Sequence, residues 1–235
     1  MKIGNVIISS VEFHGNMSLV IFLAECPLRC PYCHNAEILE SEDNAEIEEI
    51  YEKIDIAHDF IDAVNISGGE PLVQTEETIK ILKYAKEKGL KTKLDTSGIY
   101  PKQLEKILKE NIVDYVALDV KAPFNKYKEV INTNIGENVK KSMNLVNKYN
   151  VFLECRTTYV PILLNEEDVI TIAKTINCDL YTLQQFRNRV VLDGNLKDVA
   201  DPNPLELKEL ALKVKPLLTG TTVKLKTAEF GEQEI

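Results

Sequence analysis

The strongest constraint on the fold of this chain is a regular alternation of short apolar runs with helical stretches. The apolar runs at residues 19–23 and 115–120 are nearly continuous, as expected of strands that are buried on both faces. Between such runs, apolar residues recur at helical spacing over residues 76–88, and Gly89 follows where a helix commonly ends. Strands are predicted at residues 18–25, 62–67, 91–96, 114–120, 151–159 and 180–186.

Repeated strand–helix units indicate a parallel sheet whose strands are joined by right-handed crossovers. Six such units are too few for a closed eight-stranded barrel, so the sequence predicts an α/β fold with a partial (β/α)6 TIM-like barrel. Further strands near residues 2–9 and 222–226 are expected at the edges of the barrel. No linker rich in Pro, Gly or Ser divides the chain, which predicts one domain over residues 1–235.

Composition and charge limit the classes of partner. The formal net charge is −9 and no basic stretch stands out, which argues against nucleic acid. No apolar run approaches the roughly 18 residues that a membrane span needs. The first residues do not resemble a signal peptide. We therefore expect no membrane partner and a cytoplasmic location.

Polar residues of unusual kinds follow several of the predicted strands. In barrels of parallel strands the chemistry gathers at the C-terminal ends of the strands, so these residues are candidates for a functional site. Glycines at such a point let the backbone approach a ligand closely, and a carboxylate can accept from an ammonium group. The candidates are Gly68, Gly69 and Glu70 after one strand, Asp95, Thr96 and Ser97 after the next, then Asp119 with Lys121, and finally Gln184 with Gln185.

Three of the five cysteines, Cys26, Cys30 and Cys33, fall within eight residues. Three cysteines this close together favour a metal centre over disulfides. The spacing lets one loop bring three thiolates to a compact cluster. An iron–sulfur cubane has four irons, so three cysteines leave one iron without a protein ligand and able to bind a small molecule. The loop therefore predicts a 4Fe–4S cluster with one open iron.

A structural zinc site is the competing interpretation of this loop, with His34 or a distant cysteine as the fourth ligand. Zinc sites normally close with four ligands, often as two separated pairs, whereas the remaining cysteines, Cys155 and Cys178, stand alone. We interpret these two as small buried hydrophobic residues. A further alternative is a protein without enzymatic activity, in which zinc or a cluster only stabilises the fold of a binding module.

The cysteine spacing, with Tyr32 before the last cysteine, resembles the signature of the radical S-adenosylmethionine (radical SAM) superfamily. Further segments resemble one subfamily, the activating proteins of anaerobic ribonucleoside-triphosphate reductase, which are relatives of pyruvate formate-lyase activase. The resemblance covers about residues 12–190, which would be the core of a radical SAM domain, with residues 191–235 as a helix and strand extension. Besides the cysteine loop and the strand-end motifs, the resembling segments are residues 14–23, 156–161 and 183–187.

The resemblance implies two cofactors and a reaction. The amine and carboxylate of S-adenosylmethionine would chelate the open iron, and one electron through the cluster would cleave the sulfonium to methionine and a 5′-deoxyadenosyl radical. In an activase, this radical takes a hydrogen from the Cα of a glycine in a partner, here expected to be the anaerobic ribonucleotide reductase. Flavodoxin or ferredoxin would donate the electron. A radical enzyme acting on a small molecule, such as a deazapurine-forming synthase, is the alternative, because such enzymes share the fold.

The matching motifs also imply roles for single residues beside the cluster. Tyr32 and His34 would border the cofactor, and Gly69 would contact its methionine part. Glu70 would accept from the methionyl amine. The structural alternative is a Gly-Gly turn with a solvent-facing Glu70.

A second group of residues would surround the rest of the cofactor. By resemblance, Asp95, Thr96 and Asp119 would surround a monovalent cation, and Lys121 would reach the same place. Ser97 belongs to a segment that would hold ribose hydroxyls or the cofactor carboxylate, or that only caps a helix. The pyruvate formate-lyase relative has a histidine after its last barrel strand. This sequence offers glutamines there, of which Gln185 is the predicted contact.

Two ion pairs are the structural alternative for the charged residues. Asp119 and Lys121 can form a buried pair in the barrel mouth. Arg156 lies on an otherwise apolar strand and requires an anion, either the cofactor's carboxylate or Glu154, which shares its face of the strand.

Overall fold

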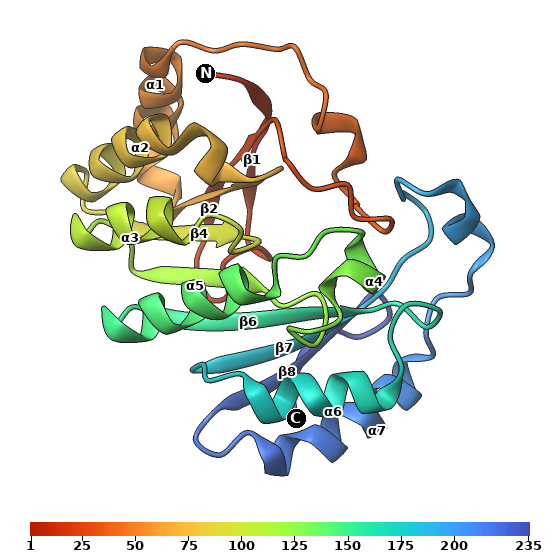
Figure 1. Cartoon of the computed structure of the whole chain (residues 1–235). Helices are drawn as coiled ribbons and strands as arrows, with labels where there is room; N and C mark the ends of the chain where they lie inside the picture. The colour runs from red at the N-terminus through yellow and green to blue at the C-terminus, as the bar shows by residue number, and fades with distance from the viewer.

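One nine-stranded sheet forms the centre of the molecule in the computed structural model, which describes residues 1–235 (Figure 1). The strands lie side by side in the order of the sequence. Strands β2 to β8 pair in parallel, whereas β1 and β9 run antiparallel at the two edges. The strands are β1 (Ile3–Ser9), β2 (Ser18–Leu23), β3 (Ala63–Gly68), β4 (Lys91–Thr96), β5 (Tyr115–Asp119), β6 (Phe152–Tyr159), β7 (Leu180–Gln185), β8 (Thr222–Thr227) and β9 (Gly231–Glu234).

The observed strands confirm the predicted fold class. The six predicted barrel strands are β2 to β7, and the two predicted edge strands are β1 and β8. Strand β8 pairs in parallel with β7 and so lengthens the parallel sheet. Strand β9 was not predicted, because its sequence Gly-Glu-Gln-Glu has no apolar residue and carries no strand pattern.

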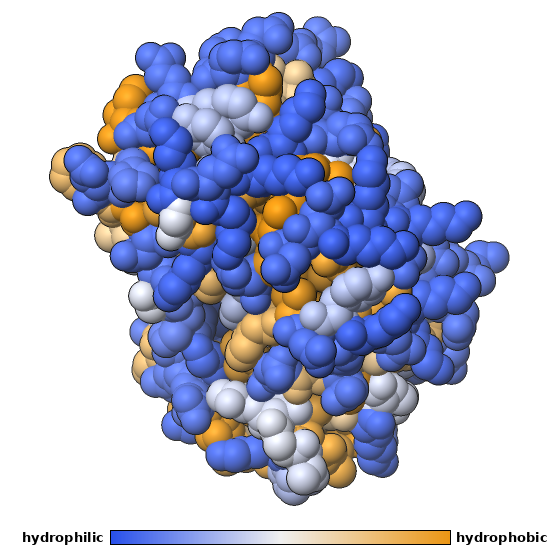
Figure 2. Space-filling view, turned by 90° about the vertical axis from the view of Figure 1, so that its left-hand side faces the viewer, coloured by the Kyte–Doolittle hydropathy of each residue, from blue (hydrophilic) through white to orange (hydrophobic).

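The helices that connect the strands cover the outer face of the curved sheet (Figure 1). Helix α2 contacts β3 and β4, α5 contacts β5 and β6, and α7 contacts β7 and β8. The face at the N-terminal ends of the parallel strands, which is the left-hand side of Figure 1, is mostly hydrophilic with some apolar patches between the polar side chains (Figure 2). The helices are α1 (Ile47–Ala57), α2 (Thr75–Glu87), α3 (Pro101–Lys109), α4 (Tyr127–Ile131), α5 (Gly136–Lys148), α6 (Glu166–Thr175) and α7 (Pro204–Val214).

The strands are buried on both faces, as their apolar runs predict. Val20 and Ile21 are neighbours on β2, so their side chains point to opposite faces, and neither side is exposed to solvent. Full burial of one such side chain contributes roughly 1.5–3 kcal/mol to stability. None of the helices combines the length and the apolarity that crossing a bilayer requires.

The loop between β1 and β2 closes the N-terminal end of the barrel. The buried Lys93 of β4 donates from Nζ to the carbonyl of Glu12 in this loop. The ring of Phe13, from the same loop, lies 5.1 Å from the ring of Tyr115 on β5. The accessible part of the barrel interior is therefore at the C-terminal ends of the parallel strands.

Candidate active site

The cysteine loop follows β2 directly and forms one wall of a cavity at the C-terminal end of the barrel. Cys30 is buried, and Cys26 and Cys33 are half-buried. Arg29 Nη1 donates to the carbonyl of Cys26 at 2.6 Å, and the Cys33 amide donates to the carbonyl of Cys30 at 3.0 Å. The three side chains line one wall of the cavity.

Burial controls the proton affinity of these thiols. It raises the pKa of Cys26 to about 12, and it raises the pKa of Cys30 as well. Since the thiolate is the form that binds metal, iron must displace protons that these side chains hold firmly at neutral pH. Cluster assembly is therefore expected to release protons and to become more favourable as the pH rises.

The cavity has a volume of about 420 Å³ and lies between the cysteine loop and the ends of strands β3 to β7. Residues that are more than 150 positions apart in the sequence meet around it. Glu70 and Gln185 are the two predicted site residues that do not line it. Those that do are Cys26, Cys30, Tyr32, Cys33, His34, Gly68, Gly69, Asp95, Thr96, Ser97, Asp119, Lys121 and Arg156.

The turn after β3 lies directly against the cysteine loop. Gly68 has φ +119°, and a Cβ there would lie 2.2 Å from the carbonyl oxygen of Leu23. A Cβ on Gly69 would lie 2.1 Å from the carbonyl oxygen of Glu25. On the other side of the loop, Asn35 Nδ2 donates to the Gly68 carbonyl at 2.8 Å. Only glycine permits this approach of two backbones, which fixes the cysteine loop to the end of β3.

Glu70 lies behind the cavity wall and not in the cavity. Its side chain is fully buried. The carboxylate accepts from the Ser97 amide and the Thr96 hydroxyl, each at 2.8 Å, from the Ser97 hydroxyl, and from the Leu72 amide at 3.2 Å. The solvent-facing alternative for Glu70 is therefore wrong, because β4 and the cysteine loop enclose the turn. Contact between Glu70 and the amine of the cofactor stays a prediction.

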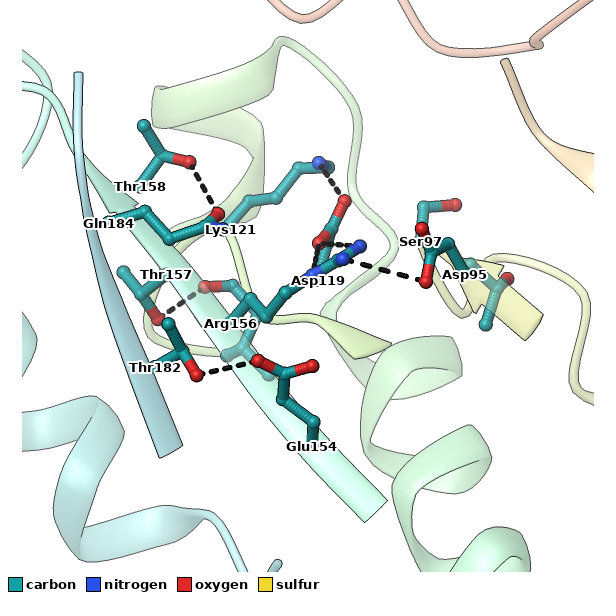
Figure 3. A network of polar contacts seen from close by, with 12 residues as sticks. Asp95, Ser97, Asp119, Lys121, Glu154, Arg156, Thr157, Thr158, Thr182 and Gln184 are labelled. Atoms are coloured by element: carbon teal, nitrogen blue, oxygen red, sulfur yellow. Dashed lines mark hydrogen bonds and ion pairs between the residues drawn. The ribbon is translucent and has the colours of Figure 1, made fainter. Parts of the chain in front are cut away.

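Arg156 is the centre of a chain of ion pairs across the cavity floor (Figure 3). Its Nη2 lies 2.9 Å from Asp119 Oδ1, and its Nη1 lies 3.5 Å from Asp95 Oδ1. Lys121 Nζ lies 3.0 Å from Asp119 Oδ2, which is the ion pair that the sequence offered as the structural alternative. Two carboxylates and two cations therefore share one polar surface opposite the cysteines.

The ion pairs set the charge state of the two aspartates. Burial alone would raise the pKa of Asp119, but Arg156 and Lys121 outweigh it and lower this pKa to about 2. Burial likewise opposes ionisation of Asp95, and Arg156 and Lys93 hold the pKa of Asp95 below its usual value. Both aspartates are consequently anionic at neutral pH.

Glu154 is not the partner of Arg156. It accepts from the Tyr115 hydroxyl at 2.9 Å and from the Thr182 hydroxyl. The two residues do share the inner face of β6, as alternation along the strand predicts. The nearer aspartates on β4 and β5 were not predictable as partners from the sequence of β6 alone, because they belong to neighbouring strands.

Gln184, and not Gln185, is the glutamine of β7 that faces the cavity. Gln184 accepts from the Thr158 hydroxyl at 3.4 Å (Figure 3). Gln185 points the other way, where its Nε2 donates to the Pro202 carbonyl and its Oε1 accepts from the Ala228 amide, both at 2.9 Å. The structure therefore places Gln184 at the cavity and the predicted Gln185 away from it, because a step of one position reverses the face of a strand.

Tyr32 and His34 flank the cysteines on the cavity wall. The Tyr32 hydroxyl is buried and has no hydrogen-bond partner, and burial raises its pKa. Burial also lowers the pKa of His34, whose ring lies 6.4 Å from that of Phe186. An unpaired hydroxyl at a cavity wall favours a polar ligand there, because a buried unsatisfied group is costly.

Several cavity residues were not singled out from the sequence, namely Glu12, Asn35, Ser67 and Thr158. Thr158 stands two residues after Arg156 on β6, so alternation along that strand was a signal for it. Ser67 directly precedes the Gly-Gly-Glu motif, and this position at the end of a strand was a signal for it. Glu12 and Asn35 lie in loops, where no periodic pattern indicates direction.

The residues around the cavity fit a cluster with an amino-acid-like ligand. Three thiols stand on one wall, and the facing wall carries anionic Asp95 and Asp119 together with cationic Lys121 and Arg156. Such a surface can pair with both an amine and a carboxylate. The cavity thus has the donors that the two predicted cofactors need.

Comparison with known proteins agrees with this geometry. The family model of the radical SAM superfamily matches residues 20–176. A protein of Methanocaldococcus jannaschii, provisionally assigned as a glycyl-radical enzyme activating enzyme, is 42% identical over 234 residues and covers 97% of each chain. The pyruvate formate-lyase-activating enzyme of Clostridium pasteurianum is 30% identical over 234 residues, which are 90% of this chain and 98% of that protein.

A solved structure shares the fold. Streptococcus suis SuiB bound to S-adenosylmethionine superposes with a TM-score of 0.70 at 17% identity, covering 86% of this chain. The match covers 48% of SuiB, so this chain spans about half of that protein's length. At this identity the similarity concerns the fold alone.

Proposed function

Because the chain belongs to the radical SAM superfamily, we propose that it generates a glycyl radical on a partner enzyme, and that this partner is an anaerobic ribonucleoside-triphosphate reductase. The observation that carries the activase role is the 42% identity to the M. jannaschii protein over 97% of both chains. The choice of the reductase as partner rests on the resemblance of residues 156–161 and 183–187 to its activating proteins. The reaction is the transfer of a hydrogen atom from the Cα of one glycine in the partner.

As a radical SAM enzyme, the protein uses a 4Fe–4S cluster and S-adenosylmethionine. When bound, these cofactors supply the one-electron cleavage that yields a 5′-deoxyadenosyl radical. We assign Cys26, Cys30 and Cys33 as the ligands of the cluster, since they share one wall of the cavity. No other cysteine lines the cavity, which leaves one iron for the amine and carboxylate of S-adenosylmethionine.

The facing wall would bind and orient the rest of the cofactor. Asp95 and Asp119 suit its ammonium group, and Arg156 and Lys121 suit its carboxylate. All four side chains are already in ion pairs when the ligand is absent, and Asp95 also pairs with Lys93, so binding exchanges partners and does not create unpaired charge. A monovalent cation held by Asp95, Thr96 and Asp119 would compete with Arg156 for the same carboxylates.

No side chain of the cavity needs to act as a general acid or base in this reaction. The chain's own task is to hold the cofactors, to exclude water from the radical, and to admit a glycine-bearing segment of the partner. The sheet is not closed between β1 and β9. An open sheet admits a protein segment more readily than a closed barrel does. Flavodoxin or ferredoxin is proposed as the electron donor.

The test is anaerobic reconstitution followed by activation of candidate partners. The protein is loaded with iron and sulfide, reduced, and mixed with S-adenosylmethionine and an anaerobic ribonucleotide reductase. We expect a glycyl radical doublet in the electron paramagnetic resonance (EPR) spectrum of the partner. A partner whose radical-site glycine is replaced by alanine is the control and should give no doublet.

Two outcomes would contradict the proposal. If S-adenosylmethionine is consumed with a small metabolite while no candidate partner gives a doublet, the protein is a radical enzyme with a small substrate. If the protein binds zinc and cleaves no S-adenosylmethionine after reduction, it is a binding module. A doublet on pyruvate formate-lyase in place of the reductase would correct only the partner.

A further inference from the structure

The buried carboxylate of Glu70 is the one charged group of the Gly-Gly-Glu turn, and it makes no contact with the cavity. It accepts four hydrogen bonds, two from Ser97, one from Thr96 and one from Leu72. Thr96 and Ser97 do line the cavity. Glu70 therefore lies directly behind the two residues with which β4 meets the cofactor space.

The backbone of the same turn is bonded to the cysteine loop. The Glu70 amide donates to the carbonyl of Glu25 at 2.9 Å, and the Gly69 amide donates to that of Leu23 at 2.8 Å. A Cβ at Gly69 would also lie 3.2 Å from the Cβ of Cys26. Through its backbone and its side chain, Glu70 thus connects the first cluster cysteine to the end of β4.

We propose that Glu70 is a positioning residue that fixes Thr96 and Ser97 at a set distance from the cluster cysteines. Its effect on S-adenosylmethionine is then indirect and passes through these two residues. The inference depends on the assigned cofactors and not on the identity of the partner enzyme.

Both oxygens of the Glu70 side chain must accept at this place, because the Leu72 amide donates to one and the Ser97 amide to the other, and a backbone amide can only donate. An ionised carboxylate has only acceptor atoms, whereas the amide of glutamine carries an NH2 group. In Glu70→Gln, this NH2 would face an N–H or O–H donor of Ser97, Thr96 or Leu72, and at least one hydrogen bond would be lost. Shape is retained, so the substitution tests the contacts with little change in packing.

The first measurement is the affinity for S-adenosylmethionine, read from the EPR spectrum of the reduced cluster as the ligand is added. Glu70→Gln should retain its iron and bind S-adenosylmethionine about tenfold more weakly, the size of effect typical of coupled neighbours. Hydrogen exchange of the Ser97 amide in the protein without cofactors should be faster in Glu70→Gln. Unchanged exchange together with unchanged affinity would overturn the proposal.

A double-mutant cycle separates an indirect effect from direct contact with the ligand. In a Thr96→Val/Ser97→Ala background the residues through which Glu70 acts have lost their hydroxyls, so adding Glu70→Gln should lower the affinity by less than about threefold. If the tenfold loss persists in this background, Glu70 acts on the ligand by another route and the inference fails.

Asp168→Asn is the matched control. Asp168 is also a buried carboxylate that accepts a backbone amide, that of Asn165 at the start of α6. It lies outside the cavity. Its substitution should change stability and leave the affinity for S-adenosylmethionine at the wild-type value. If Asp168→Asn weakens binding as much as Glu70→Gln does, the loss is a general effect of stability and not of positioning.

Discussion

Arg156 is the residue on which the polar half of the site depends. Its guanidinium pairs with aspartates from two neighbouring strands, and its side chain is only 14% exposed. Removal of one partner from a buried ion pair leaves an uncompensated charge, which costs more than the pair itself contributes. Arg156 is therefore important for stability even before a ligand binds.

Arg156→Met should lower the free energy of unfolding by about 2 kcal/mol, because Asp95 and Asp119 lose their shared partner and keep one cation each, Lys93 and Lys121. Urea denaturation of the protein without cofactors measures this. The control is Lys213→Met, which removes the exposed ion pair with Glu166 on the surface of α7. That variant should be unchanged, because exposed ion pairs contribute little. Equal stability of both variants would contradict the buried network.

Cys30→Ala should abolish cluster assembly, because a cubane with two protein ligands is not held. The matched control is Cys155→Ala, in which the replaced thiol is fully buried on β6 outside the cavity. Iron content after anaerobic reconstitution is the measurement. Loss of iron in the Cys155 variant, with retention in the Cys30 variant, would mean that the ligands are misassigned.

Single residues also mark the limits of what the sequence could predict. The cysteines and the strand-end motifs were found because their types and spacing are unusual. Gln184 and Gln185 are chemically identical neighbours, so only the exact register of β7 decides which one faces the cavity. The burial of Glu70 depends on an approach of two loops that no local pattern encodes.

At the scale of elements, the turn after β3 joins the sheet to the cysteine loop. The strands themselves were predictable, because continuous apolar runs separated by helical stretches define a parallel sheet. Strand β9 was not, since it depends on pairing with Lys224 to Thr227 of β8 and not on its own composition. The close contact of Gly68 with Leu23 is likewise a tertiary feature.

Gly68→Ala should destabilise the protein by at least about 2 kcal/mol more than Gly89→Ala does. Both glycines have positive φ, at +119° and +78°, so both variants carry backbone strain. Only at Gly68 does the new Cβ also meet backbone, since nothing lies within 4 Å of the Cβ position at Gly89. Urea denaturation gives the difference. Similar losses in both variants would show that the contact with Leu23 is easily relieved.

At the scale of the whole molecule, the charges inside the barrel make stability depend on pH. The pKa of Asp119 is about 2 in the folded protein, against about 3.9 in an unfolded chain. Because the folded value is the lower one, Asp119 contributes fully above the unfolded value, progressively less as the pH falls toward 2, and nothing below it.

The free energy of unfolding should therefore fall more steeply between pH 4 and pH 2 in the wild type than in Asp119→Asn. At neutral pH the variant should be the less stable of the two, and the difference should shrink with acid. Urea denaturation over a series of buffers tests this. Parallel curves for the two proteins would show that Asp119 is not ionised by its partners.

The positions of the cavity walls along the chain determine when the cavity is completed during protein synthesis. Cys26 lies near the start of the chain, whereas Gln184 lies on the seventh strand, and both line the same cavity. A ribosome that makes the chain from its N-terminus presents all three cluster cysteines long before the strands that enclose them exist. A nascent chain that ends before β7 would have its thiols exposed to solvent and oxygen. Protection of the cluster is thus a property that arises only late in synthesis.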